Sequence, residues 1–494
     1  MLQTIESINN VVNNFIWGVP AMICIIGVGL YLSLRTGFVQ IRKFPYALKT
    51  TLGRIFKKKE ASDGSMTPFQ AVCTALAGTV GTGNIAGVAG AIAIGGPGAV
   101  FWMWVSALLG MCTKFTEVTL AVHFRERNRH GDYVGGPMYY IKNGLGKNWR
   151  FLAVLYSAFG VLTVFGTGNA TQVNTITTAI DTALINFNVI SESSTGRLNL
   201  ILGIVITLLV GMVLLGGIKR IGSVSEKLVP FMALFYIVLA LGVVILNIGR
   251  VPAVFHDIVY GAFNPSAVTG GVIGSFFLSM KKGVSRGIFS NEAGLGTGSI
   301  AHACADTSKP VKQGMFGIFE VFADTIVVCS MTGLVVIVTG YWNSGLQGSE
   351  LTLTAFESGM GSVARALIAL SIFLFGLTTS TGWFTYYSVI LKHWLKNNQK
   401  VFKIAEKVFI LGTPLWGLLV TVLTLYGNGT PAQLWVIADF TTVFPTFVNV
   451  ATLFILSGTF IKLLKDYKAR YLGIGKVDED MALFYEDKKA KEEK

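Results

Sequence analysis

The stretch Gly78-Thr79-Val80-Gly81-Thr82-Gly83-Asn84-Ile85-Ala86-Gly87 interrupts, with glycine, a hydrophobic segment that could otherwise form one continuous membrane helix. A second interruption, Ser290-Asn291-Glu292-Ala293-Gly294-Leu295-Gly296-Thr297-Gly298, lies in the C-terminal half of the chain. In hydrocarbon every backbone N–H and C=O needs a partner within the protein, so a helix unwinds at mid-depth only where the freed groups face a cavity or a ligand. The two stretches therefore predict two broken membrane helices beside a common binding site.

The composition indicates a polytopic membrane protein. The 494 residues are 52% hydrophobic and 13% charged, whereas soluble domains carry about 25% charged residues. Between Asp63 and Lys114 there is no charged residue, and this stretch is long enough for two helices of about 20 residues each. Five cysteines lie in or at the ends of apolar segments and predict free thiols. They are Cys24, Cys73, Cys112, Cys304 and Cys329.

Apolar runs of spanning length define eleven segments. Their approximate bounds are 15–34, 67–94, 98–122, 151–180, 199–217, 228–248, 267–302, 318–341, 362–391, 405–426 and 432–463. The seventh is too long for one simple helix, which fits a broken one.

The basic residues alternate between the loops. The loops 35–64, 123–150, 218–227, 303–317 and 392–404 hold eight, six, three, two and four Lys or Arg residues, and nine follow Phe460. The loops between them hold none, or only Arg197 or Arg250. The net charge of +14 therefore reflects membrane topology and not a nucleic-acid partner. By the positive-inside rule we expect a multi-pass protein of the cell membrane with the N-terminus outside and the C-terminus in the cytoplasm.

The predicted fold is an all-α polytopic membrane protein of about eleven transmembrane helices, one N-terminal helix plus a five-plus-five inverted repeat. The glycine interruptions fall in the first helix of each group of five, and the two groups start on opposite sides of the membrane. We divide the chain into an additional helix (1–34), a basic amphipathic cytoplasmic segment (35–66), two repeats (67–248 and 249–463) and a charged cytoplasmic tail (464–494). This organisation is typical of secondary transporters.

Five motifs lie along the chain: VGTGNIAG (80–87), GGPGAVFWMWVSALLG (95–110), GGPMYY (135–140), GGIK (216–219) and FSNEAGLG (289–296). They resemble the signature of the alanine/glycine:cation symporter family, also called sodium:alanine symporters, from near residue 15 to about residue 460. The resemblance implies the leucine-transporter-type fold and sodium-coupled uptake of small neutral amino acids, alanine and glycine foremost, by alternating access.

The two breaks suit the two ends of a zwitterion. A half-helix N-terminus offers N–H groups and a partial positive charge to a carboxylate, and unwound carbonyls suit an ammonium group. We therefore place the N–H groups of Thr82 and Gly83 on the substrate carboxylate. The carbonyls near Phe289 and Ser290, with Asn291, are the candidates for the ammonium. Close helix packing is the alternative role for some of these glycines.

Polar residues in other segments complete the expected site. Gln172 is an amide in an apolar helix that needs at least an interhelical hydrogen bond, and the resemblance matches it to a substrate-contacting glutamine. Four hydroxyls follow one another from Thr378 to Thr381; they can bond their own helix or offer oxygen to sodium. By resemblance, Thr378 and Thr379 with the carbonyls of Ala77, Val80 and Phe375 form one sodium site, and Thr79 with Asn84 forms another. The resemblance also places Thr379 and Trp383 at the substrate, where Trp383, Phe165 and Phe289 cap the pocket.

Several alternatives remain open. The sequence has no HExxH or GxSxG motif and no His or Cys cluster, so we expect no enzyme activity and no cofactor, with Na⁺ as the coupling ion. Proton coupling is the rival, with Glu292 as the nearby acid; glutamine or serine are alternative substrates. A channel is less favoured because it needs a continuous pore. We expect a monomer in lipid, a local ion pair between Lys114 and Glu117, and structural roles for Glu320 and Asp324.

Overall fold

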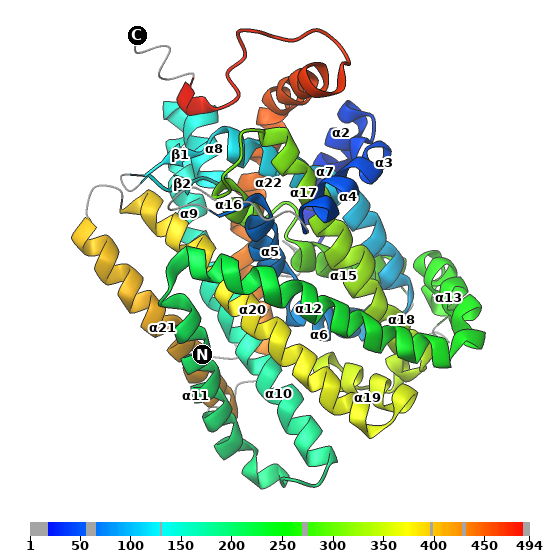
Figure 1. Cartoon of the computed structure of the whole chain (residues 1–494). Coiled ribbons are helices and arrows are strands. Elements are labelled where there is room, and N and C mark those ends of the chain that lie inside the picture. The colour runs from blue at the N-terminus through cyan, green and yellow to red at the C-terminus, as the bar shows by residue number, and fades with distance from the viewer. Residues whose placement is uncertain are drawn as a thin grey trace.

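The computed structural model describes residues 18–55, 66–128, 131–268, 275–395, 399–426 and 431–487. Apart from one hairpin, in which β1 (Glu126–Arg127) pairs antiparallel with β2 (Tyr133–Val134), the regular structure of these residues is helical (Figure 1). Within these described residues, seven helices are long and apolar enough to cross a membrane, or eight when a bent pair is taken as one span. The fold is therefore an all-helical, polytopic one.

The helices of the first half are α2 (Val19–Thr36), α3 (Val39–Arg42), α4 (Phe44–Ile55), α5 (Pro68–Thr79), α6 (Ala86–Gly95), α7 (Gly98–His123), α8 (Pro137–Gly144), α9 (Arg150–Phe165), α10 (Thr171–Asn186), α11 (Thr195–Leu214) and α12 (Gly217–Leu246). Those of the second half are α13 (Val251–Phe263), α14 (Pro265–Val268), α15 (Phe276–Asn291), α16 (Thr297–Ala303), α17 (Pro310–Val321), α18 (Ser330–Val338), α19 (Gly348–Met360), α20 (Ser362–Trp394), α21 (Gln399–Tyr426) and α22 (Pro431–Leu472).

Each of the eleven predicted segments contains helix. The stretches 249–266 and 342–361 were expected to be loops, yet they hold α13 and α19. A search for runs of spanning length does not detect helices of 13 residues each, because such helices are too short to cross the hydrocarbon.

Both predicted breaks are present. The first separates α5 from α6 at a short 3₁₀ turn, Thr82–Asn84, and the two halves are bent by 56°. The second follows Asn291, where Glu292, Gly294 and Gly296 have φ angles of 55°, 101° and 84°. Positive φ is accessible mainly to glycine, and a non-glycine residue there marks a special position. The glycines of the second stretch are therefore required by its backbone.

Two further helices are widened locally. The turn Gly166–Ala170 between α9 and α10, and the turn Phe322–Cys329 between α17 and α18, are π-helical. Such bulges release backbone carbonyls and occur often at functional sites.

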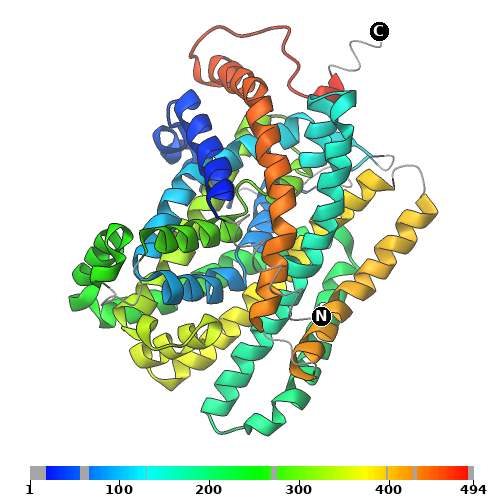
Figure 2. The ribbon, with the colours of Figure 1, turned by 180° about the vertical axis from the view of Figure 1, so that it is seen from behind.

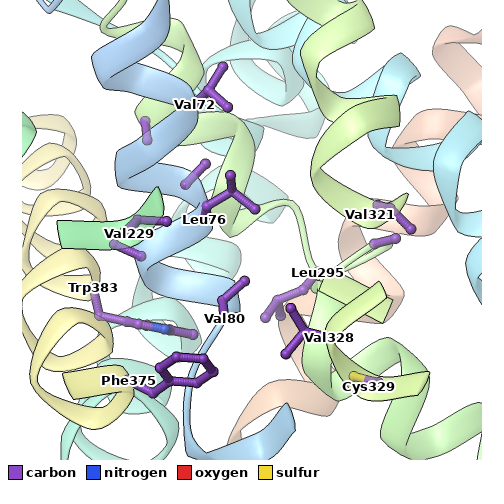
Figure 3. Packing of buried hydrophobic residues seen from close by; sticks show 14 of the residues in the cluster. Val72, Leu76, Val80, Val229, Leu295, Val321, Val328, Cys329, Phe375 and Trp383 are labelled. Carbon is purple, nitrogen blue, oxygen red and sulfur yellow. The ribbon is translucent and has the colours of Figure 1, made fainter. Parts of the chain in front are cut away.

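The helix α5 lies inside the molecule, against α12, α16 and α20. Val72 and Leu76 are buried along it, and Val80, just after its end, lies beside Phe375 and Trp383 of α20 (Figure 3). On the opposite side of the molecule, α22 runs along its length beside α2 and α9 (Figure 2). This packing leaves the two breaks at the centre of the helix bundle.

The Lys- and Arg-rich connections meet at one end of the molecule, which we call the basic face. It comprises β1, β2, α8, the segment 304–309 and the ends of α4 and α22 (Figure 1). Tyr46 of α4 and Tyr467 of α22 have their hydroxyl oxygens 2.9 Å apart, and Lys392 lies 3.9 Å from the Asp132 carboxylate.

Candidate functional site

A small cavity, with room for about one water molecule, lies between the two breaks. Its lining residues are Gly78, Thr79, Gly81, Gly83, Thr167, Gln172, Phe289, Ser290, Glu292 and Thr379. Six of the predicted site residues line it, namely Thr79, Gly83, Gln172, Phe289, Ser290 and Thr379.

At the first break, Gln172 holds the unwound backbone. Its Oε1 accepts from the Thr82 N–H (3.2 Å) and from the Thr82 hydroxyl (2.9 Å). Its Nε2 donates to the Thr167 carbonyl at 3.0 Å. The sequence assigns the Thr82 N–H to the substrate carboxylate. In the structure this N–H donates to the amide oxygen of Gln172, so the predicted site residues Thr82 and Gln172 bond to each other.

Asp324 joins the first break to the second. Its Oδ1 accepts from Asn84 Nδ2 at 2.6 Å, and its Oδ2 accepts from the Ser290 hydroxyl at 2.8 Å. The three side chains are buried. Thr79, paired with Asn84 in the sequence-based site, instead donates to the carbonyl of Ala75 in its own helix at 3.2 Å. Sequence reasoning gave Asp324 a structural role, although an acidic residue in a membrane segment is a signal of function.

The hydroxyl run of α20 crosses the end of α5. Thr379 Oγ1 approaches the Val80 carbonyl at 3.5 Å, and Thr378 Oγ1 donates to the Phe375 carbonyl at 2.9 Å. A Cβ on Gly382 would lie 3.2 Å from the Ala77 carbonyl carbon. Of the residues named for the first sodium site, Thr379 therefore reaches the Val80 carbonyl across the helices, whereas Thr378 bonds within α20.

The aromatic residues predicted to cap the pocket lie differently. Phe289 lines the cavity and faces Gly83. Trp383 does not belong to the lining; its Nε1 donates to the Gly78 carbonyl at 3.1 Å, and its ring packs against Gly168. Phe165 also lies outside the lining and packs against Phe409 and Trp416 of α21.

The unwound backbone of the second break is held from behind. Glu117 Oε1 accepts from the Gly294 N–H (2.8 Å) and from Asn449 Nδ2 (2.7 Å), and Asn449 Nδ2 also donates to the Gly294 carbonyl at 2.8 Å. The Tyr156 hydroxyl donates to the Leu295 carbonyl at 2.9 Å. These bonds satisfy groups that would otherwise be unpaired in the membrane.

Asn291, a predicted ammonium ligand, also serves the backbone of this break. Its Oδ1 accepts from the Ala293 N–H at 2.9 Å, and its Nδ2 donates to Thr325 at 3.0 Å.

A buried charge network lies next to the second break. Lys114 Nζ pairs with Glu320 Oε1 at 3.1 Å, and His302 Nε2 lies 2.9 Å from Glu320 Oε2. The expected local pair between Lys114 and Glu117 was wrong, because Glu117 binds the backbone of Gly294. The network spans three helices, α7, α16 and α17, and breaking a buried ion pair of this kind by removing one partner is strongly destabilising.

The whole chain has recognisable relatives. Residues 2–478 match the sodium:alanine symporter family. An uncharacterized transporter from Haemophilus influenzae is 43% identical over 97% of this chain and 99% of its own length. The sodium/alanine symporter AgcS from Methanococcus maripaludis is 38% identical over 93% of this chain and 97% of its own length.

The fold also has a counterpart among solved structures. The structure of MhsT in complex with L-phenylalanine superposes with a TM-score of 0.55 at 15% identity, over 83% of this chain and 90% of that one. This is the leucine-transporter-type fold, whose halves form an inverted repeat. The chain therefore belongs to the sodium:alanine symporter family, whose members are amino-acid transporters of the membrane and not enzymes.

Proposed function

We propose that this protein takes up small neutral amino acids, alanine and glycine foremost, together with Na⁺ by alternating access. The observation that supports this most is the cavity between two broken helices, lined by Gly83 and by Gln172, whose amide oxygen accepts from the Thr82 N–H and hydroxyl. Backbone donors of this kind bind a carboxylate without a buried side-chain charge. The name of the AgcS relative supports alanine as the substrate.

In this proposal the substrate carboxylate binds at Thr82 and Gly83, where it takes the place of the Gln172 oxygen and leaves Gln172 Nε2 as a further donor. The ammonium binds near the Phe289 and Ser290 carbonyls, which end α15 and carry its partial negative charge. Thr379 borders the substrate. Asn291 and Trp383 support the site through backbone bonds, and Phe165 closes its outer side through α21.

Two sodium sites are proposed next to the cavity. One has the hydroxyls of Thr378 and Thr379 with the carbonyls of Ala77, Val80 and Phe375. The other has Asn84 beside the substrate carboxylate, as expected from the sequence, with Thr79 at its edge. We add the Asp324 carboxylate to the second site, because it contacts Asn84 and carries the negative charge that a hard cation favours.

Glu292 keeps proton coupling as the second candidate, because it lines the cavity. Its hydroxyl partner is Thr297.

We further propose eleven membrane helices, with α2 added to two repeats of five, the basic face in the cytoplasm, and a monomeric protein in the cell membrane. The division into residues 1–34, 35–66, 67–248, 249–463 and 464–494 follows from this topology.

The test is uptake of radiolabelled alanine into proteoliposomes at constant pH, with an inward sodium gradient or with choline in place of sodium. Uptake that requires sodium supports the proposal. Uptake that follows a proton gradient without sodium would show proton coupling. It would refute the two sodium sites and make Glu292 the candidate proton carrier. Absence of alanine uptake, with glutamine or serine taken up instead, would keep the coupling and change the substrate.

A further inference from the structure

Thr167 differs from the other threonines on its helix. Thr163, Thr171 and Thr175 each donate to the carbonyl four residues earlier, at 2.9, 3.1 and 2.7 Å. Among the residues that the structure describes, Thr167 Oγ1 is buried without a hydrogen-bond partner, and Thr167 lines the cavity. Back-bonding is the ordinary state of a threonine in a helix, so the hydroxyl of Thr167 has been left for another partner.

Thr167 lies within the π-helical turn Gly166–Ala170. The N–H of Thr171 bonds to the carbonyl of Gly166, five residues back, and the carbonyl of Thr167 accepts from Gln172 Nε2. The other polar side chains at the cavity are engaged: Gln172 with Thr82, and Ser290 with Asp324. A buried hydroxyl without a partner is costly, and a ligand in the cavity is placed to supply one.

We propose that the Thr167 hydroxyl bonds a polar atom on the side chain of the transported amino acid, which makes serine a substrate that the site distinguishes from alanine. This inference rests on the proposed function. The carboxylate and ammonium, shared by all amino acids, have their partners at the breaks. A site that offers a hydrogen bond to a substrate hydroxyl discriminates against the analogue that lacks it.

The test is competition of serine and of alanine against labelled alanine uptake by the Thr167→Val and Thr167→Ser variants. We expect Thr167→Val to weaken serine about tenfold relative to alanine, a change of about 1.4 kcal/mol, and Thr167→Ser to keep the original ratio. Thr175→Val is the control, because Thr175 bonds its own helix.

An equal change for serine and alanine, or none, would overturn the assignment of Thr167. Failure of the unmodified protein to take up any amino acid would instead refute the proposed function.

A second and independent observation concerns the segment after α22. Residues 473–487 turn back across the basic face toward β1 (Figure 1). His123 Nδ1 lies 2.8 Å from the Leu483 carbonyl, and the Arg127 N–H donates to Glu486 Oε1 at 2.5 Å. The guanidinium of Arg125 lies over the Phe484 ring, 4.8 Å from its centroid. The segment is therefore fastened just beyond the end of α7.

Arg125 connects the C-terminal segment to the residues that follow α16. Its two terminal nitrogens donate to the carbonyls of Ala305 (2.5 Å) and Thr307 (2.8 Å). Burial lowers the pKa of Arg125 to about 10, so the guanidinium remains charged at neutral pH. Phe484 covers this buried cation from one side, and the Tyr133 ring lies 3.7 Å from it.

The residues after α16 that Arg125 binds, Ala305 and Thr307, belong to a segment that also bonds to the start of the other broken helix. Met66 donates to the Cys304 carbonyl at 3.2 Å, and the Asp306 N–H donates to the Met66 carbonyl at 2.8 Å. Met66 lies just before α5, and Ala305 lies just after α16. The opposite ends of α5 and α16 lie at the two breaks, so these half-helices stand between the cavity and the basic face.

We propose that residues 478–487 form a strap that keeps α5 and α16 together, and that its release accompanies opening of the cavity toward the basic face. Cys304 reports on this opening, because its carbonyl accepts from Met66 where the segment after α16 meets the start of α5. Its side chain is only 3% exposed. The measurement is the rate at which a membrane-impermeant maleimide labels Cys304 in proteoliposomes, followed by peptide mass spectrometry. Cys112, which is buried in α7 against Thr36, serves as the internal control.

Truncation after Lys476 should raise the labelling rate of Cys304 several-fold. Truncation after Asp487 is the matched control, because it keeps every contact of the strap and should leave the rate unchanged. Phe484→Ala, with Phe484→Tyr as its control, tests the same contact in the full-length chain. Equal labelling of Cys304 in the truncated, Phe484→Ala and unmodified proteins would overturn the strap, as would a parallel rise at Cys112.

Discussion

At the scale of single residues, Thr82 offers two donors to Gln172 and allows them to be separated. Thr82→Val removes the hydroxyl bond of 2.9 Å and retains the N–H bond. In the proposed complex the substrate carboxylate replaces Gln172, and a bond to a charged group contributes about 1.5–3 kcal/mol against about 0.5–1.5 kcal/mol for the neutral bond that it replaces, so the KM for alanine should rise roughly 5- to 10-fold. Thr82→Ser retains both donors and should transport normally. Sodium-dependent alanine uptake by the two variants checks this, and equal losses in both would show that the hydroxyl is not the cause.

Thr379 is proposed both to border the substrate and to bind sodium. Replacing its side chain distinguishes these two roles. Thr379→Ala removes an oxygen that lies 3.5 Å from the Val80 carbonyl. If it binds sodium, the sodium concentration for half-maximal uptake should rise about tenfold, equivalent to about 1.4 kcal/mol, while uptake at saturating sodium is nearly kept. Thr379→Ser is the control. A higher KM for alanine with unchanged sodium dependence would assign Thr379 to the substrate alone.

At the scale of elements, the second break depends on glycine for its backbone. Gly296 has a φ of 84°, and a Cβ there would lie 2.5 Å from Pro137. Gly296→Ala should therefore lower the melting temperature of the purified protein and reduce its yield, since strain at positive φ costs roughly 1–3 kcal/mol. Gly90→Ala, within α6 where a Cβ meets nothing within 4 Å, should be neutral or slightly stabilising. Similar stability of the two variants would contradict this account.

The same contrast explains which elements could be predicted. The breaks at 78–87 and 290–298 were predictable, because glycine within an apolar segment is a local signal. The partner of Asn84 was not, since Asp324 lies 240 residues away and only the folded bundle brings them together. For the same reason Lys114 was paired with its neighbour Glu117 and not with Glu320. Thr167 escaped notice because its hydroxyl is unusual only relative to the bonds of Thr163, Thr171 and Thr175.

At the scale of the whole molecule, the charge pattern and the fold agree. Two of the basic loops predicted to share one side of the membrane, 123–150 and 392–404, meet at the basic face, where Lys142 bonds Glu126 at 2.5 Å and Lys392 reaches Asp132. Apolar side chains are exposed along α11, including Ile201, Leu208 and Met212, as expected for a surface that faces lipid. The alternation of Lys and Arg along the sequence thus anticipated which connections are neighbours in space.

The proposed sites predict how sodium and amino acid depend on each other in the complete transporter. The backbone from Ala77 to Gly83 passes through both proposed sodium sites and the carboxylate site, so a ligand that orders this stretch favours the others. Coupling between sites is reciprocal: alanine should raise the affinity for sodium by the same factor by which sodium raises the affinity for alanine. Coupling energies of about 1–3 kcal/mol correspond to roughly 5- to 150-fold.

Equilibrium binding of labelled alanine at several sodium concentrations, and sodium titrations at several alanine concentrations, measure the two factors on one preparation. Asp324→Asn should reduce both factors together, because its carboxylate links Asn84 of the first break to Ser290 of the second. Ser223→Ala, on an exposed hydroxyl of α12 that bonds its own helix, should leave both unchanged. If alanine binds with the same affinity at every sodium concentration, the two binding equilibria are not coupled, which would refute symport through this site.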